Sequence, residues 1–99
     1  MELFLLFKSY NLYRGDIIYK ELIKKYINKI TINDIKQFAY YQKESITNEE
    51  ANIILTHIKK YKEELLNKNT SSFKILKQNI RKDLFNKIEQ LYNEYSYYI

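Results

Sequence analysis

His57 is the only histidine in the sequence and the first side chain to consider for chemistry. A protein metal site normally brings several His, Cys or carboxylate ligands to one point. The sequence has no His-x-x-His or Glu-x-x-His spacing and no cysteine, so no second ligand accompanies this histidine. We therefore interpret His57 as a boundary residue of a helix, partly buried beside Tyr61, and we expect no metal and no cofactor.

Two pairs of adjacent acids, Glu49-Glu50 and Glu63-Glu64, are the next candidates, because paired carboxylates can perform acid–base catalysis. Such catalysis needs two carboxylates that share a cleft in different environments. Adjacent residues on a helix point about 100° apart, and these two pairs lie at opposite ends of one predicted helix. The single glycine, Gly15, rules out a glycine-rich phosphate-binding loop. We expect a protein that is not an enzyme and has no small-molecule substrate.

The composition of the chain raises a second possibility, because 17 basic and 12 acidic residues leave a net charge of +5. Ile, Lys, Tyr and Asn together account for 51 of the 99 residues. Their codons are rich in A and T, so an A/T-rich genome produces this composition without selection for a ligand. The charge is nevertheless uneven, since residues 1–30 and 67–99 each carry +3 and residues 31–66 carry −1.

Nucleic-acid binding through the two basic segments is therefore the alternative function for this chain. It requires that residues 1–30 and 67–99 lie side by side in the fold. The candidate contacts are basic residues of these two segments: Lys20, Lys24, Lys25, Lys74, Lys77, Arg81 and Lys82.

The clearest predicted helix covers residues 47–66 and begins with a capping box. In this motif the Thr47 hydroxyl accepts a hydrogen bond from the backbone of Glu50, whose carboxylate accepts one from the backbone of Thr47. Apolar residues then recur at the spacing of one helix face and form a stripe along about five turns: Ala51, Ile54, Leu55, Ile58, Tyr61 and Leu65.

A shorter helix is predicted over residues 31–42, because Thr31 and Asp34 occupy the positions of a second capping box. Its inward-facing residues are expected to be Ile35, Phe38, Ala39 and Tyr41.

Two short helices in succession raise the question of a DNA-reading helix-turn-helix, whose second helix places its first residues against base edges. Here those residues are 47–52, and they include Glu49 and Glu50. Two carboxylates at this position would face phosphate groups. The repulsion between these like charges costs more free energy than hydrogen bonds from neighbouring amide side chains to the bases would recover. We therefore interpret the two helices as a corner of a helical bundle.

Further helices are predicted toward both ends of the chain. Asp16 is a suitable N-cap for a helix that runs to residue 30, and a polar loop precedes a last helical region over 71–96, which is one helix or two. Residues 1–15 are interpreted as a helical extension because a lone strand is not stable. Their apolar run over 3–7 is too short to span a membrane or to form a signal-peptide core. We expect a cytoplasmic protein with no membrane contact.

Together these elements predict an all-α fold, a small single-domain bundle of four to five helices. The length of 99 residues suits one domain, with residues 16–96 as its helical core and 1–15 as an extension. The apolar residues at helical spacing are expected to form the core: Leu22, Ile27, Ile30, Ile35, Phe38, Ile54, Leu55, Ile58, Leu65, Leu76, Leu84, Ile88 and Leu91.

Three stretches also resemble a known family. They are I-N-K-I-T-I-N-D-I-K-Q-F-A at 27–39, I-T-N-E-E-A-N-I-I at 46–54 and L-F-N-K-I-E-Q-L-Y-N-E-Y at 84–95. Over about 27–95 the chain resembles the small YqfT-like proteins of low-GC Gram-positive bacteria, a domain-of-unknown-function family. The chain departs from the family at 80–83, which lack a Ser or Thr helix start. The resemblance implies a small helical cytoplasmic protein and no catalytic residue.

The function favoured by the sequence is that of a non-catalytic protein-interaction or regulatory module. An apolar amino-terminal run and a Tyr-rich carboxy-terminal stretch supply more apolar surface than a small core needs, and such surface can dock a protein partner or a second copy of the chain. The candidate interaction surface comprises Leu3, Phe4, Phe7, Tyr95, Tyr97 and Tyr98.

Overall fold

The computed structural model describes residues 17–96, with side chains from Lys20 onward. Within this range the regular secondary structure consists of helices, which short loops connect. The predicted extension over 1–15 and the Asp16 cap lie outside the described residues. No helix within 17–96 is long and apolar enough to cross a bilayer. The described elements are α2 (Ile17–Lys29), α3 (Ile32–Tyr41), α4 (Asn48–Lys60), α5 (Lys62–Leu66), α6 (Phe73–Asn79) and α7 (Lys82–Tyr95).

Both predicted capping boxes are present, and they set the starts of α3 and α4. The Thr31 hydroxyl accepts from the Asp34 backbone at 3.2 Å, and the Asp34 carboxylate accepts from the Thr31 backbone at 2.9 Å. The corresponding two bonds between Thr47 and Glu50 are both 3.0 Å. Each box satisfies two backbone donors that the first turn of a helix leaves unpaired.

The helix predicted over 47–66 is interrupted, which is one reason why the prediction of four to five helices is wrong. Tyr61 ends α4 and precedes α5, with φ −109° and ψ 21°, outside the regular helical range. The interruption changes the phase of the apolar stripe. Leu66 is therefore buried with 3% of its surface exposed, whereas the predicted core residue Leu65 is only half-buried.

The last helical region consists of two helices, which is the second reason for the higher count. Ile80 and Arg81 separate α6 from α7, and both have extended backbone, with ψ angles of 162° and 151°. Two extended residues cannot continue the backbone hydrogen-bond ladder of a helix. The chain therefore turns, and α7 packs back against α6.

Two lysines in left-handed conformation end α3 and α5. Lys43 has φ 61° and Lys68 has φ 63°. After α3, the backbone N–H of Glu44 donates to the carbonyl of Ala39 at 2.9 Å, and after α5 the N–H of Asn69 donates to the carbonyl of Glu64 at 2.8 Å. These are the long bonds of Schellman motifs, which usually carry glycine at the left-handed position.

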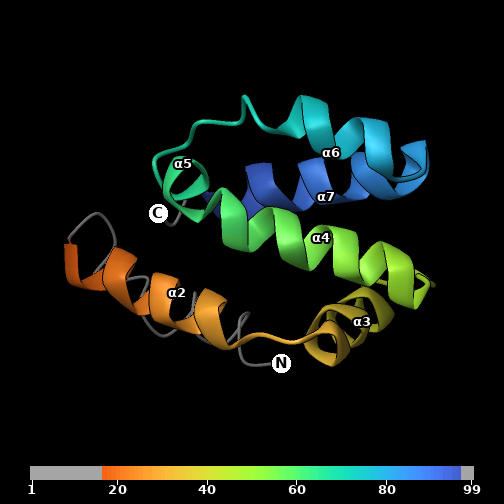
Figure 1. Cartoon of the computed structure of the whole chain (residues 1–99), viewed down its shortest axis with the longest axis horizontal. Coiled ribbons are helices and arrows are strands. Elements are labelled where there is room, and N and C mark those ends of the chain that lie inside the picture. Colours follow the sequence, from red (N-terminus) through yellow and green to blue (C-terminus); the bar gives the residue numbers. More distant parts are fainter. Residues whose placement is uncertain (1–16, 97–99) are drawn as a thin grey trace.

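Helix α4 is the central element of the fold. Figure 1 shows it running through the middle of the molecule, with α2 and α3 on one side and α6 and α7 on the other. Helix α4 packs against α2, α3 and α6. One cluster of the core joins Phe73, Leu76 and Phe85, and the rings of Phe73 and Phe85 meet edge to face at 5.9 Å.

The fold buries fewer of the predicted core residues than the sequence pattern indicates. Four of them are buried: Ile30, Ile54, Leu76 and Leu84. Buried residues absent from the predicted core include Ile23, Ala51, Phe73 and Phe85. The other nine predicted core residues are half-buried: Leu22, Ile27, Ile35, Phe38, Leu55, Ile58, Leu65, Ile88 and Leu91.

Candidate functional site

An apolar cavity of about 260 Å³ lies among the helices and is the main candidate site in the described residues. Its lining includes seven of the half-buried residues that the sequence assigned to the core. We call this cavity the apolar groove and define it by those residues: Ile27, Ile35, Phe38, Ile58, Leu65, Ile88 and Leu91.

All six described helices contribute residues to the walls of the apolar groove, and buried residues also line it. Ile23 and Ile54, with 3% and 6% of their surface exposed, belong to its lining as well. Among its charged residues are Asp34, Glu44 and Lys87. A concave, mostly apolar surface with a few polar groups is the usual character of a binding site.

His57 is the buried polar residue that lines the apolar groove, and it retains 7% of its surface exposed. Its Nε2 lies 3.1 Å from the hydroxyl of buried Ser72, within hydrogen-bond distance. Its ring lies 4.7 Å from that of Tyr61 and 6.2 Å from that of Phe73. Burial, and then the positive charge of Lys60, lower the pKa of His57 below its ordinary value of 6.5. The predicted position beside Tyr61 is confirmed, but burial is more complete than expected.

Tyr92 belongs to the part of the apolar groove that α7 provides. Its hydroxyl donates to the carbonyl of Leu65, and its ring meets that of Phe73 edge to face at 5.4 Å. Burial raises the pKa of the Tyr92 phenol. A buried tyrosine needs a partner for its hydroxyl, and this bond fastens α7 to the end of α5.

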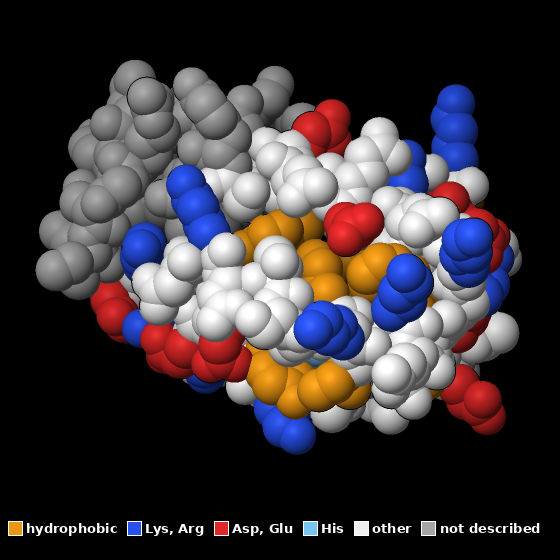
Figure 2. All heavy atoms as spheres, turned by 90° about the horizontal axis from the view of Figure 1, so that it is seen from above, with side chains coloured by type: hydrophobic (Ala, Val, Ile, Leu, Met, Phe, Trp, Pro, Cys, Tyr) orange, Lys and Arg blue, Asp and Glu red, His pale blue; other side chains and the backbone are white. Residues whose placement is uncertain are grey.

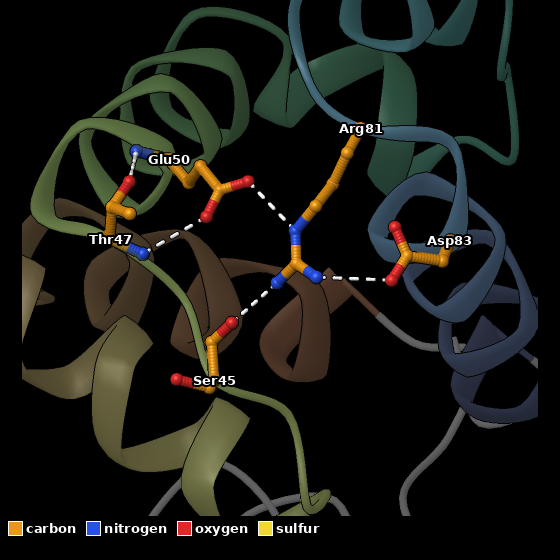
Figure 3. Close-up of polar contacts among 5 residues, drawn as sticks. All are labelled: Ser45, Thr47, Glu50, Arg81 and Asp83. Carbon is orange, nitrogen blue, oxygen red and sulfur yellow. Dashed lines mark hydrogen bonds and ion pairs between the residues drawn. The ribbon is translucent and has the colours of Figure 1, made fainter.

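A second polar arrangement surrounds Arg81, between α6 and α7 (Figure 3). Its Nε donates to Glu50 at 2.9 Å, its Nη1 donates to Asp83 at 3.0 Å, and its Nη2 donates to the carbonyl of Ser45. The backbone N–H of Thr47, and then Arg81, lower the pKa of Glu50. The arrangement is a clamp that joins α7 to the corner between α3 and α4, and we call it the Arg81 clamp.

The Arg81 clamp provides evidence on whether α3 and α4 form a DNA-reading helix-turn-helix, because it binds a side chain in the first turn of α4. Glu50 is held by Arg81, and the side-chain oxygen of Asn48 accepts from Lys36 at 2.8 Å. First-turn side chains of a recognition helix must be free to reach base edges. Here two of them are engaged within the protein, which agrees with the interpretation of a corner.

The structure places the predicted nucleic-acid contacts on two sides of α4. Lys20, Lys24 and Lys25 lie on α2, whereas the others lie on α6, on α7 or between these two helices. Figure 1 shows α4 between α2 and α6. The two sets therefore lie on helices that α4 separates.

Several of these cations also have partners within the protein. Lys24 pairs with Glu63 at 3.0 Å and with Glu21 at 3.2 Å, and both hydrogen bonds raise its pKa. Lys20 donates to the side chain of Asn67 at 3.4 Å. On the face seen in Figure 2, Lys and Arg side chains are scattered among acidic and hydrophobic ones and form no continuous patch. Lys25, Lys74 and Lys82 are exposed.

Of the predicted interaction surface, Tyr95 lies in the described part of the chain and lines the apolar groove. Leu3, Phe4, Phe7, Tyr97 and Tyr98 lie outside the described residues. The expectation that Tyr41 faces inward is wrong, because 58% of its surface is exposed.

Tyr41 belongs instead to an exposed aromatic pair on α3. Its ring meets that of Tyr40, which is 75% exposed, edge to face at 5.9 Å. The sequence analysis did not predict this pair. The sequence offered one sign of it. Tyr40 and Tyr41 are the last two residues of a short helix, and residues at a helix end need not continue its inward-facing stripe.

Among the described residues, no three His, Cys, Asp or Glu side chains are grouped as metal ligands. No protein-family model, curated protein or solved structure matches this chain. The resemblance to YqfT-like proteins therefore stays a prediction.

Proposed function

We propose that this chain is a non-catalytic protein-binding module whose docking site is the apolar groove. The observation that supports the proposal is the half-burial of seven aliphatic and aromatic side chains around one cavity of about 260 Å³. The apolar face of an amphipathic helix is normally buried in the core. Here several such faces line a concave surface that stays partly accessible to solvent. Binding an apolar segment there removes apolar area from water on both partners.

The partner that fits this groove is an amphipathic helix. Helix-in-groove recognition places apolar side chains at positions i, i+3 or i+4, and i+7 of the bound helix into a hydrophobic groove. The walls of the apolar groove consist of helices, and Leu91 lies on the wall that α7 provides. Few charged groups line the groove, so we expect the selectivity of binding to come from apolar spacing.

Selection from a displayed library of helical peptides tests the proposal. We expect enrichment of peptides with apolar residues at the spacing given above, and we expect Leu91→Glu to abolish their binding. The matched control is Asn93→Glu, which introduces the same charge at an exposed position of α7. Leu91→Ala serves as a milder variant, and circular dichroism checks that all three remain helical.

Two results would count against the proposal. One is a library that yields no peptide with this spacing, and the other is binding that Leu91→Glu and Asn93→Glu reduce equally. Binding of nucleic acid in place of peptides, with a strong dependence on salt, would support the alternative function instead.

A further inference from the structure

We propose that His57 makes docking in the apolar groove dependent on pH, so that the groove holds an apolar helix at neutral pH and releases it as the pH falls toward about 5. The inference rests on the proposed function and names a regulation of the same site. It follows from where His57 lies, from the groups around it and from what docking does to the solvent near its ring.

His57 belongs both to the interior of the fold and to the wall of the groove. It retains 7% of its surface exposed and lines the groove beside Ile54 and Ile58 of the same helix. The rings of Tyr61 and Phe73 lie 4.7 and 6.2 Å from its imidazole ring. A titratable side chain therefore lies among apolar and aromatic ones at the surface where the partner docks.

The hydrogen bond of His57 is compatible with both protonation states of the ring. Its Nε2 lies 3.1 Å from the Ser72 hydroxyl. This hydroxyl can donate to a neutral imidazole or accept from it, and it accepts from a protonated ring, in which both nitrogens are donors. Protonation can therefore leave this bond in place. The cost of protonation is the cost of placing a positive charge in apolar surroundings.

The charged groups around His57 do not offset a positive charge on its ring. Burial, and then the like charge of Lys60 on the same helix, lower the pKa of His57, and no carboxylate of the described residues raises this pKa. Helices α5 and α6 contribute only apolar side chains to the lining of the groove. The other titratable residues of the lining come from α2, from α3 and the turn after it, and from α7: Tyr26, Asp34, Glu44, Lys87, Tyr92 and Tyr95.

The two carboxylates of this lining act on other parts of the protein. The carboxylate of Asp34 accepts the backbone N–H of Thr31 at 2.9 Å, and the charge of Glu44 raises the pKa of Arg81. Histidine is the side-chain type that ordinarily changes its charge between about pH 5 and 8, and His57 is the only histidine in the chain. A change of docking in this range is therefore expected to follow the protonation of His57.

Docking of an apolar helix makes the protonated ring less favourable. Much of the groove lining is half-buried, so solvent that enters the free groove can hydrate a charged imidazole at its wall. An apolar partner displaces this solvent. The bound state therefore disfavours the protonated ring more than the free state does. Because the coupling between two binding events is reciprocal, protons weaken the binding of the partner by the same factor.

The affinity of the full chain for a helical peptide at several pH values tests the inference. The probe is a peptide selected at about pH 7 from the library described above and free of His, Asp and Glu, so that its own charge stays constant between about pH 7 and pH 5. We expect its dissociation constant to rise about threefold or more over this range, and by no more than about tenfold per pH unit, the limit for one proton. An equal affinity at both pH values would overturn the inference and preserve the proposed function.

His57→Gln is the matched variant, because glutamine can also bond to Ser72 and carries no charge. Whatever its affinity at neutral pH, we expect that affinity to change little as the pH falls. If the unmodified chain and the variant show the same dependence on pH, other groups are responsible and the inference is wrong.

An NMR titration of the single histidine needs no variant, so it decides the question even where His57→Gln does not fold. The imidazole signals give the midpoint of protonation in the free chain and in the chain saturated with the peptide. We expect the midpoint to be lower in the complex by about half a pH unit or more, which is the reciprocal of a threefold loss of affinity. A midpoint that is unchanged or higher in the complex would contradict the inference.

A neutral solvatochromic dye separates the inference from the proposed function. A chain that selects no peptide at neutral pH overturns the proposed function, and the dye then replaces the peptide in the same titrations. Dye binding that weakens at low pH in the unmodified chain, but not in His57→Gln, would preserve the dependence of the groove on His57. Dye binding that is absent, or independent of pH, would overturn the inference as well.

Discussion

The guanidinium of Arg81 donates to the carboxylate of Glu50 across 2.9 Å, although the two residues are 31 positions apart in the chain. The other oxygen of the same carboxylate accepts the backbone N–H of Thr47 at 3.0 Å. One carboxylate thus completes the cap of α4 and holds the connection between α6 and α7. The carboxylate of Glu50 therefore fixes the start of α4 and, through Arg81, the start of α7.

Replacing Arg81 with alanine is expected to destabilise the fold, because Glu50 loses its cationic partner and the carbonyl of Ser45 loses a donor. Arg81→Lys is expected to recover only part of the stability, because an ammonium cannot donate in three fixed directions as a guanidinium does. Thermal unfolding followed by circular dichroism measures both effects.

Lys82→Ala is the matched control for the Arg81 clamp, because it removes a neighbouring exposed cation. We expect it to change the midpoint of thermal unfolding much less than Arg81→Ala does. Equal shifts of the unfolding midpoint for Arg81→Ala and Lys82→Ala would show that the loss of one positive charge, and not the loss of the clamp, changes the stability.

The sequence predicted the starts of α3 and α4 well and the ends of the helices poorly, and the reason is local. A capping box involves two residue types at a fixed spacing, Thr followed three positions later by an acid, and both examples are visible in the sequence. The usual sign of a helix end is glycine. Here Lys43 and Lys68 adopt the left-handed conformation instead, and no sequence pattern marks a lysine as a helix end.

These two lysines give a prediction about stability. A residue with a Cβ atom is strained by about 1–2 kcal/mol in the left-handed region, and glycine loses about 0.4–1 kcal/mol of this advantage through the greater freedom of the unfolded chain. Lys43→Gly and Lys68→Gly are therefore each expected to stabilise the protein by about 0.5–1 kcal/mol. The control is Lys59→Gly on an exposed position inside α4, which should destabilise by about 1 kcal/mol. Urea unfolding gives the three values, and a loss of stability in the first two variants would contradict the assigned backbone conformation.

The apolar groove could not be predicted from the sequence, although the seven residues that define it were all identified as apolar residues at helical spacing. Ile35, Phe38 and Leu91 have the spacing of core residues, and the spacing alone does not say whether a helix packs over them. Their burial depends on how α3 and α7 lie relative to each other. That arrangement depends on the breaks at Tyr61 and at 80–81, which carry no proline or glycine signal.

The division of the basic residues between two sides of α4 gives a prediction about nucleic acids. Because Lys24 and Arg81 are paired with acids, we expect few phosphate contacts and release from heparin at low salt. A titration of double-stranded DNA at several salt concentrations measures the number of contacts from the slope of affinity against salt. Tight binding at physiological salt, weakened by Lys25→Ala together with Lys74→Ala, would contradict this expectation.

His57 gives a prediction about pH, because it is the only histidine and its pKa in the folded chain is lowered from 6.5. Burial in contact with Tyr61 and Phe73 is the main cause, and Lys60 contributes a like charge. The unfolded chain therefore binds more protons than the folded chain as the pH falls below about 6.5. Stability should fall in this direction, with a slope of at most about 1.4 kcal/mol per pH unit.

The measurement is urea unfolding at several values between pH 7 and pH 5, where carboxylates contribute little because their ordinary pKa values are about 4. His57→Gln is the control, since an amide can also bond to Ser72 and carries no charge. We expect the variant to be less stable at pH 7, because its side chain fills the site less well, and nearly independent of pH in this range. An equal slope in both proteins would assign the pH dependence to other groups, and a flat profile in the unmodified chain would show that the folded protein accepts the protonated imidazole.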